Sequence, residues 1–203
     1  MLFSGTLTVP TEASGVVVFA HGSGSSHLSP RNQRVAEFLN SAGYGTYLFD
    51  LLTPAEQAER ANVFDIELLG RRLAEATRWV TDQPAVRRLP FGYFGASTGA
   101  AAALWAAAEP DLDVRAVVSR GGRPDLTGDR LCRVMAPTLL IVGGLDCHVL
   151  ALNWRAARQL RAECHVTVVP GASHLFEELG TLDAAAELAR DWFSEHLGQD
   201  GRI

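Results

Sequence analysis

Residues 91–108 read FGYFGASTGAAAALWAAA, and this stretch decides the fold. The apolar, aromatic run that ends at Phe94 predicts a buried strand, and the alanine-rich run 100–108 predicts a helix. Between them, Gly95-Ala96-Ser97-Thr98-Gly99 predicts a tight turn whose small residues let the backbone close around a serine. The helix that follows directs its N-terminal amides toward that serine. Ser97 is therefore the first candidate for a reactive residue.

The rest of the chain alternates short apolar runs with longer helical patterns. Strands that are apolar almost throughout indicate a doubly wound, mostly parallel α/β sheet with helices on both faces. Residues 2–9 alternate more, which predicts an antiparallel edge strand, and nothing marks a second domain within residues 1–203. The predicted strands are 16–20, 44–49, 91–94, 114–119, 138–142 and 166–169, and the predicted helices are 32–42, 64–81, 100–108, 149–162 and 182–196.

The composition narrows the class of protein. A chain of 203 residues with 47% hydrophobic content can bury a full core without a disulfide or a metal. Cys132, Cys147 and Cys164 are odd in number and lack metal-binding spacing, so we expect a reducing, cytoplasmic setting. The first 20 residues hold no basic residue and no long apolar run, so we expect neither a signal peptide nor a membrane span.

All 18 basic residues are arginine, and the absence of lysine has chemical consequences. A chain without lysine forms no side-chain Schiff base, holds no PLP covalently and builds no Walker A loop. The net charge of -5 and the scattered arginines give no basic stripe, so nucleic-acid binding is not expected. The expected partner is a small molecule.

A serine hydroxyl becomes a nucleophile when a base takes its proton and a third group orients that base. In a parallel sheet, such groups gather where the strands end. His174 follows the last predicted strand, and Asp146 follows the strand before it. The order Ser97, Asp146, His174 is therefore a nucleophile, acid and base in strand contexts that bring them to one edge.

Other interpretations of these residues stay open. Asp146 could cap the helix that follows it, and His174 could be a histidine of a surface loop. Asp125, after the strand 114–119, is the second-ranked candidate for the acid. Arg120 directly follows the same strand and could bind an anionic substrate group, or it could be a solvated or ion-paired arginine.

A tetrahedral oxyanion needs two directed N–H donors. The turn supplies one from Thr98, the residue after the nucleophile. The second is expected from the loop after the strand 16–20, which reads His21-Gly22-Ser23-Gly24. The Ser23 amide is the best candidate there, and His21 is expected to organise the loop.

At this point the chain resembles the α/β-hydrolases, and within that fold the dienelactone hydrolase-like group of small hydrolases. The resemblance covers nearly the whole chain. It implies that Ser97 is the nucleophile, Asp146 the acid and His174 the base, with the amides of Ser23 and Thr98 as the oxyanion hole. The motifs that carry it are His21-Gly22-Ser23-Gly24, Gly95-Ala96-Ser97-Thr98-Gly99, Leu145-Asp146 and Gly171-Ala172-Ser173-His174.

Two features refine what the resemblance implies. Dienelactone hydrolases use a cysteine nucleophile where this chain has Ser97, which favours ordinary carboxylic esters over dienelactone. Cap domains in such hydrolases usually follow the strand equivalent to 114–119, and here only 120–137 intervenes. An open site suited to short acyl groups is therefore expected, with no metal and no cofactor.

We expect a short-chain esterase that works through an acyl-enzyme. A thioesterase, a lactonase or an acyltransferase with the same triad is the nearest alternative, because only the leaving group or the acceptor differs. A non-catalytic relative that binds a small molecule is the alternative of another class. The sequence leaves the physiological substrate and the oligomeric state open.

Overall fold

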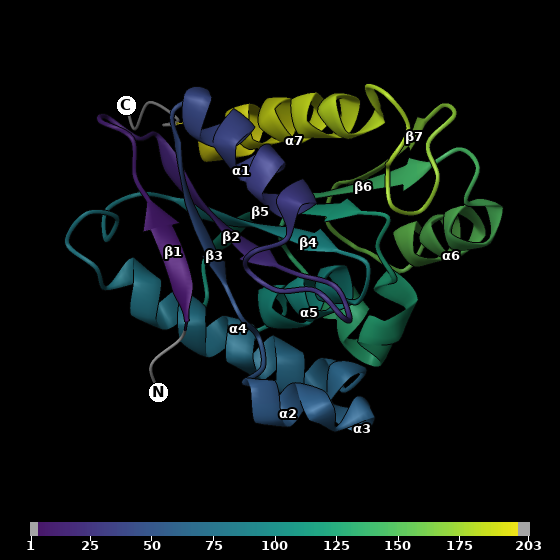
Figure 1. Cartoon of the computed structure of the whole chain (residues 1–203), viewed down its shortest axis with the longest axis horizontal. Helices are drawn as coiled ribbons and strands as arrows, with labels where there is room; N and C mark the ends of the chain where they lie inside the picture. Colours follow the sequence, from purple (N-terminus) through teal and green to yellow (C-terminus); the bar gives the residue numbers. More distant parts are fainter. Residues whose placement is uncertain (1–3, 199–203) are drawn as a thin grey trace.

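A computed structural model describes residues 4–198, so the start of the predicted edge strand lies outside the described residues. One seven-stranded sheet has the order β1-β3-β2-β4-β5-β6-β7, and only β1 is antiparallel to its neighbour (Figure 1). The doubly wound, mostly parallel sheet predicted from the sequence is therefore confirmed. The strands are β1 (Gly5–Thr8), β2 (Gly15–Ala20), β3 (Tyr44–Phe49), β4 (Phe91–Ala96), β5 (Val114–Arg120), β6 (Thr138–Gly143) and β7 (Cys164–Val169).

Helices cover both faces of the sheet (Figure 1). Alternation along β2 shows the two sides: Val16 and Val18 pack against α4 and α5, whereas Val17 and Phe19 pack against α1 and α7. Burial on both faces explains why the strands are apolar almost throughout. The helices are α1 (Pro30–Ser41), α2 (Pro54–Ala58), α3 (Arg60–Val63), α4 (Ile66–Thr81), α5 (Thr98–Ala107), α6 (Cys147–Ala157) and α7 (Thr181–Leu197), with a 3-10 helix η1 (Pro124–Arg133).

Helix α5 explains why residues 98–107 are so rich in small side chains. All ten of its residues are buried, because it lies between the sheet, α4 and η1. Alanine combines high helix propensity with a volume small enough for such close packing. The helix begins directly after Ser97, so the tight packing of α5 also fixes the position of the turn.

The connection between β3 and α4 differs from the prediction. The helix predicted over 64–81 begins at Ile66, and two short helices, α2 and α3, precede it. Thr53 and Glu56 form a capping box around the start of α2 at Pro54. That start signal is present in the sequence, but a five-residue helix is too short to produce a visible apolar period.

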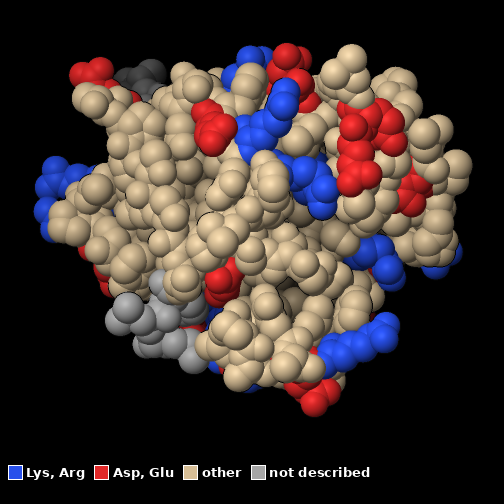
Figure 2. All heavy atoms as spheres, viewed as in Figure 1, with Lys and Arg blue, Asp and Glu red and all other residues tan. Residues whose placement is uncertain are grey.

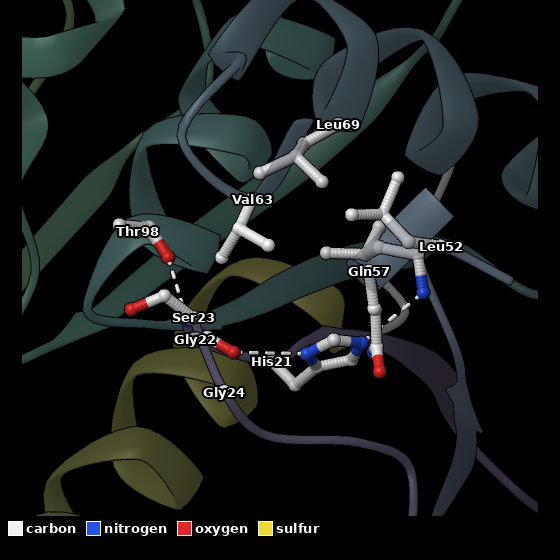
Figure 3. A pocket seen from close by; sticks show the side chains of 10 residues that line it. His21, Gly22, Ser23, Gly24, Leu52, Gln57, Val63, Leu69 and Thr98 are labelled. Carbon is white, nitrogen blue, oxygen red and sulfur yellow. Dashed lines mark hydrogen bonds between the residues drawn. The ribbon is translucent and has the colours of Figure 1, made fainter. Parts of the chain in front are cut away.

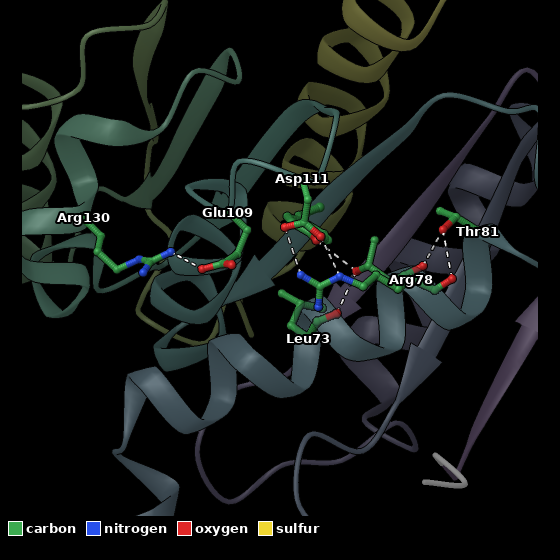
Figure 4. A network of polar contacts seen from close by, with 8 residues as sticks. Leu73, Arg78, Thr81, Glu109, Asp111 and Arg130 are labelled. Carbon is green, nitrogen blue, oxygen red and sulfur yellow. Dashed lines mark hydrogen bonds and ion pairs between the residues drawn. The ribbon is translucent and has the colours of Figure 1, made fainter.

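The segment between β5 and β6 holds only η1 and its flanking turns, so the described chain has no cap domain. Two arginines fasten the turn that follows α5 to the helices beside it (Figure 4). Arg78 of α4 donates two hydrogen bonds of 2.8 and 3.0 Å to Asp111. Arg130 of η1 pairs with Glu109 and stacks over the ring of Trp105. These contacts join α4, α5 and η1 into one layer.

The outer surface carries charges of both signs. Acidic and basic side chains are interspersed over the face shown in Figure 2. Arg34 of α1 donates to both carboxylate oxygens of Asp183 in α7 at 2.8 Å, which joins the two helices of one layer. Within residues 4–198, no helix has both the length and the hydropathy that crossing a bilayer requires.

Candidate active site

Ser97 occupies the turn between β4 and α5 in a strained conformation, with φ 51° and ψ −120°. Such a conformation costs on the order of 1–3 kcal/mol for a residue other than glycine, so the surroundings must hold it. The Ser97 amide donates to the carbonyl of Arg120 at 3.2 Å, and the Ser97 carbonyl accepts from the Arg123 amide at 3.1 Å. A Cβ at Gly99 would lie 2.1 Å from the carbonyl oxygen of Ala20, so this flank must be glycine.

The structure brings Ser97, His174 and Asp146 together. His174 lies in the loop after β7, and its Nε2 is 3.3 Å from Ser97 Oγ. Its Nδ1 is 2.7 Å from Asp146 Oδ2, in the turn after β6. An ionised carboxylate accepts hydrogen bonds only, so Nδ1 carries the proton and Nε2 presents its lone pair to the serine hydroxyl. This arrangement can remove the serine proton.

Backbone contacts hold the two loops in register. The Leu145 amide donates to the carbonyl of Ala172 at 2.9 Å, which ties the loop of Asp146 to that of His174. The Ser173 amide donates to Glu178 Oε2 at 2.9 Å, and this hydrogen bond lowers the pKa of the Glu178 carboxyl. His174 and Asp146 are therefore positioned by main-chain contacts as well as by their own hydrogen bond.

Asp146 makes the contacts expected from both interpretations that the sequence left open. Its Oδ1 accepts from the Val149 amide at 3.4 Å at the start of α6, while its Oδ2 faces His174. The rival acid, Asp125, instead accepts two hydrogen bonds of 2.8 Å from Arg123. Of the two aspartates, only Asp146 is paired with the histidine.

The expected oxyanion donors also meet, with an unpredicted contact between them. Thr98 begins α5, and its Oγ1 accepts a 2.8 Å hydrogen bond from the Ser23 amide. Thr98 is buried, with 4% of its surface exposed. The Ser23 amide and the N-terminus of α5 are thus adjacent beside Ser97, and the Ser23 amide is already partnered.

His21 organises the loop that carries Ser23. Its Nδ1 lies 3.0 Å from the Gly22 carbonyl, and its Nε2 accepts from the Leu51 amide at 3.1 Å. This pairing requires the neutral ring with its proton on Nδ1. Burial lowers the pKa of His21 below 6.5, which favours the same neutral form. The contact joins the end of β2 to the end of β3.

Arg120 lies at the end of β5 with only 6% of its surface exposed. Its guanidinium donates to the carbonyl of Leu175 and to Asn32 of α1, both at 3.4 Å, and lies 5.6 Å from the ring centroid of Phe176. Burial, together with the nearby charge of Arg31, lowers the pKa of Arg120 to about 10. These contacts reach the segment directly after His174, and a contact with substrate stays a prediction.

A cavity of about 110 Å³ opens beside the loop of residues 21–24 (Figure 3). The apolar residues that line it come after β3 and from α3 and α4, and none of them is among the predicted site residues. The adjacent leucines at 51 and 52 could have indicated it, because only Asp50 separates them from the predicted strand 44–49. The lining residues are His21, Gly22, Ser23, Gly24, Leu51, Leu52, Gln57, Val63, Leu69 and Thr98. Among residues 4–198, no three His, Cys, Asp or Glu side chains group where they could hold a metal ion.

Solved structures include a relative of this chain, although no protein-family model matches it. A dienelactone hydrolase from Anabaena variabilis ATCC 29413 is 54% identical, with a TM-score of 0.92 over 95% of this chain and 91% of that chain. Est1E from Butyrivibrio proteoclasticus, which has also been solved with ferulic acid bound, is 14% identical. Its TM-score of 0.79 over 95% of this chain and 93% of that chain shows a shared fold alone.

Two proteins of Mycobacterium tuberculosis are 64% identical to this chain over 194 residues. Both are named, provisionally, as phosphoribosyl transferases. The match covers 96% of this chain and 44% of each relative, so this chain spans less than half of their length. The name phosphoribosyl transferase was therefore given to longer proteins, and the region that they share with this chain is less than half of each.

Proposed function

The chain belongs to the dienelactone hydrolase family of α/β-hydrolases, and from that premise we propose that it is a serine hydrolase of short-chain carboxylic esters. The observation that carries this proposal is the chain of hydrogen bonds from Ser97 through His174 to Asp146, with distances of 3.3 and 2.7 Å. A protein that only binds a ligand has no need for these three groups in this order.

The proposed reaction has two halves. Ser97 Oγ attacks the ester carbonyl while His174 Nε2 takes the hydroxyl proton, and Asp146 stabilises the imidazolium that forms. His174 then gives the proton to the leaving alcohol, which departs and leaves an acyl group on Ser97. Water attacks this acyl-enzyme with His174 as the base, and release of the acid restores the hydroxyl.

An oxyanion forms both when Ser97 is acylated and when water attacks the acyl-enzyme, and it needs hydrogen-bond donors at the N-terminus of α5. The Thr98 amide is the first donor of the proposed hole, and the dipole of α5 adds to its effect. The Ser23 amide is the second group of the proposed hole, and in the structure it donates to Thr98 Oγ1. Arg120 supports the site by holding the segment after His174 through the Leu175 carbonyl.

A short acyl group fits the open site. The His174 side chain is 38% exposed, and the described chain has no cap domain above it. A thioesterase, a lactonase or an acyltransferase would use the same acyl-enzyme, so these activities are alternatives within the same site. The name of the mycobacterial relatives is not carried over, because the shared region is 44% of each of them.

A fluorophosphonate probe tests the proposal directly, because it reacts with serines that a neighbouring base activates. We expect one labelled site, Ser97, in the folded protein and none after denaturation. Ser97→Ala should abolish labelling, whereas Ser23→Ala, which keeps its backbone amide, should retain it. Absence of labelling in the folded wild-type protein would refute the proposed function.

A further inference from the structure

The cavity beside the loop of residues 21–24 has a defined place relative to the proposed nucleophile. A Cβ at Gly22 would lie 3.1 Å from Cβ of Ser97, so the wall formed by Gly22 is in direct contact with the reactive serine. Ser23 and Thr98 lie in the same wall (Figure 3). A carbonyl oxygen held by these two residues would therefore place its carbon at the mouth of the cavity.

Apart from His21 and Gln57, the side chains in the remaining walls are apolar. Leu52, Val63 and Leu69 point their side chains into the cavity from three different segments (Figure 3). Among the ten described residues that line it, none is Arg, Asp or Glu, and His21 is held neutral by its bond from the Leu51 amide. Burying a charged group here would leave the charge without a partner, which is costly.

The position of the base decides which half of an ester enters the cavity. His174 must reach the oxygen of the leaving alcohol to protonate it, so the alcohol lies on the side of His174. His174 is not among the residues that line the cavity. The other substituent of the carbonyl carbon is the acyl chain, and it is the group left to occupy the cavity.

We propose that this cavity is the acyl-binding site and that it selects neutral, unbranched acyl groups of up to about four carbons. The proposal rests on the proposed esterase function and names its substrate class. A cavity of about 150 Å³ lined by aliphatic and aromatic residues can hold benzene, with six carbons. A volume of about 110 Å³ is correspondingly suited to about four carbons.

The test compares kcat/KM for the p-nitrophenyl esters of acetate, butyrate, hexanoate and octanoate. The wild-type protein should prefer acetate or butyrate and lose at least about tenfold by octanoate. Leu69→Ala enlarges the cavity and should shift the optimum to hexanoate. Leu73→Ala is the matched control, because Leu73 is buried one turn further along α4 and does not line the cavity.

A variant with a smaller cavity and a substrate with a charged acyl group extend the test. Val63→Phe places a larger side chain in the cavity from the end of α3. None of the residues of α3 is buried, so the substitution should not disturb the core. The variant should hydrolyse the butyrate ester more slowly relative to the acetate ester.

The effect of charge is tested with two ethyl esters. Ethyl butyrate should be hydrolysed at least about a hundredfold faster than monoethyl succinate, whose acyl group carries a carboxylate. Circular dichroism checks that each variant is folded.

The outcomes are distinguishable. The acyl-site proposal is overturned if Leu69→Ala and Leu73→Ala have the same chain-length profile, if Val63→Phe leaves the butyrate to acetate ratio unchanged, or if monoethyl succinate is the better substrate. The proposed function is still supported in all three cases, since esters are hydrolysed. Only a protein that neither labels at Ser97 nor hydrolyses any ester contradicts both.

The hydrogen bond between Ser23 and Thr98 carries a second, independent inference. Thr98 Oγ1 accepts from the Ser23 amide at 2.8 Å, so the hydroxyl proton is free to point elsewhere. Within the described chain, that hydroxyl donates to no residue. Oγ1 is three bonds from the backbone nitrogen of Thr98, so the hydroxyl and the amide of the same residue can reach one oxygen atom.

We infer that the Thr98 hydroxyl donates a hydrogen bond to the oxyanion and that the Ser23 amide acts through it. A hydroxyl that already accepts a hydrogen bond is a stronger donor, because linked hydrogen bonds polarise one another. No rearrangement of the loop is then needed when the oxyanion forms. Preorganised donors of this kind stabilise the charge that develops in the transition state without having to reorient.

Thr98→Val and Thr98→Ser separate this role from a structural one, with p-nitrophenyl acetate as the substrate. Valine keeps the shape and the backbone amide, and it should lower kcat by about 10²–10³ with little change in KM. Serine restores the hydroxyl and should restore kcat to within about threefold. A valine variant with wild-type or higher kcat would overturn the inference, because the hydroxyl would then only be obstructing the Ser23 amide.

Discussion

At the scale of single residues, Asp146 offers the sharpest test of the proposed site. Asp146→Asn should lower kcat/KM on the order of 10³–10⁴-fold, because an amide that accepts from His174 cannot stabilise the imidazolium. Asparagine is as good a helix cap as aspartate, so the start of α6 should be preserved. Steady-state kinetics on p-nitrophenyl butyrate measures the loss, and thermal unfolding checks the cap.

Asp125→Asn is the matched control. Its carboxylate pairs with Arg123 two residues away, and it makes no contact with His174. We expect activity within a few-fold of the wild-type protein. A large loss with Asp125→Asn and none with Asp146→Asn would reassign the acid and contradict the proposed geometry.

The sequence was most informative about residues whose position depends on strand ends. Ser97, Asp146 and His174 each follow a different strand, and parallel strands end at one edge of the sheet. The hydrogen bond between the Ser23 amide and the Thr98 hydroxyl could not be predicted from strand ends. It depends on the conformation of a loop rich in glycine and serine, which carries no periodic signal.

At the scale of elements, the contact between α4 and α5 is unusually close. A Cβ at Gly70 of α4 would lie 2.4 Å from a ring atom of Trp105 in α5. Helix propensity alone predicts that Gly70→Ala stabilises by about 1 kcal/mol. Overpacking at a buried contact costs about 1–3 kcal/mol, so we expect the free energy of unfolding in urea to fall.

The same substitution in a Trp105→Leu background isolates the cause. With the ring removed, the clash disappears and only the helix propensity is left, so Gly70→Ala should become neutral or stabilising there. The difference between the two backgrounds is the coupling free energy of the pair. If Gly70→Ala stabilises the protein that retains Trp105, the helices can separate without cost and the packing argument is wrong.

Element type was more predictable than element length. The strand 44–49 agrees with β3, whereas the helix predicted over 149–162 ends at Ala157 in α6. Apolar periodicity identifies a long amphipathic element. When the loop after a helix also packs on the core, the apolar pattern continues into that loop and the predicted helix end lies too far along the chain. Leu160 is such a case, since it is buried in the core beyond α6.

At the scale of the whole molecule, His21 couples folding to pH. The folded state needs its neutral ring, because Nε2 accepts from the Leu51 amide, and burial lowers its pKa from 6.5. As the pH falls below about 6.5, the unfolded chain takes up a proton that the folded protein does not. The free energy of unfolding should therefore decrease as the pH falls, and this contribution is complete above about 6.5.

Urea denaturation between pH 7.5 and about 5 measures this dependence. The contribution of His21 cannot exceed about 1.4 kcal/mol per pH unit, which is the slope for one proton. His21→Gln should be less stable at pH 7.5 but should have a flatter slope, because glutamine does not titrate. Equal slopes for the wild-type protein and His21→Gln would show that His21 is not the group that links folding to pH.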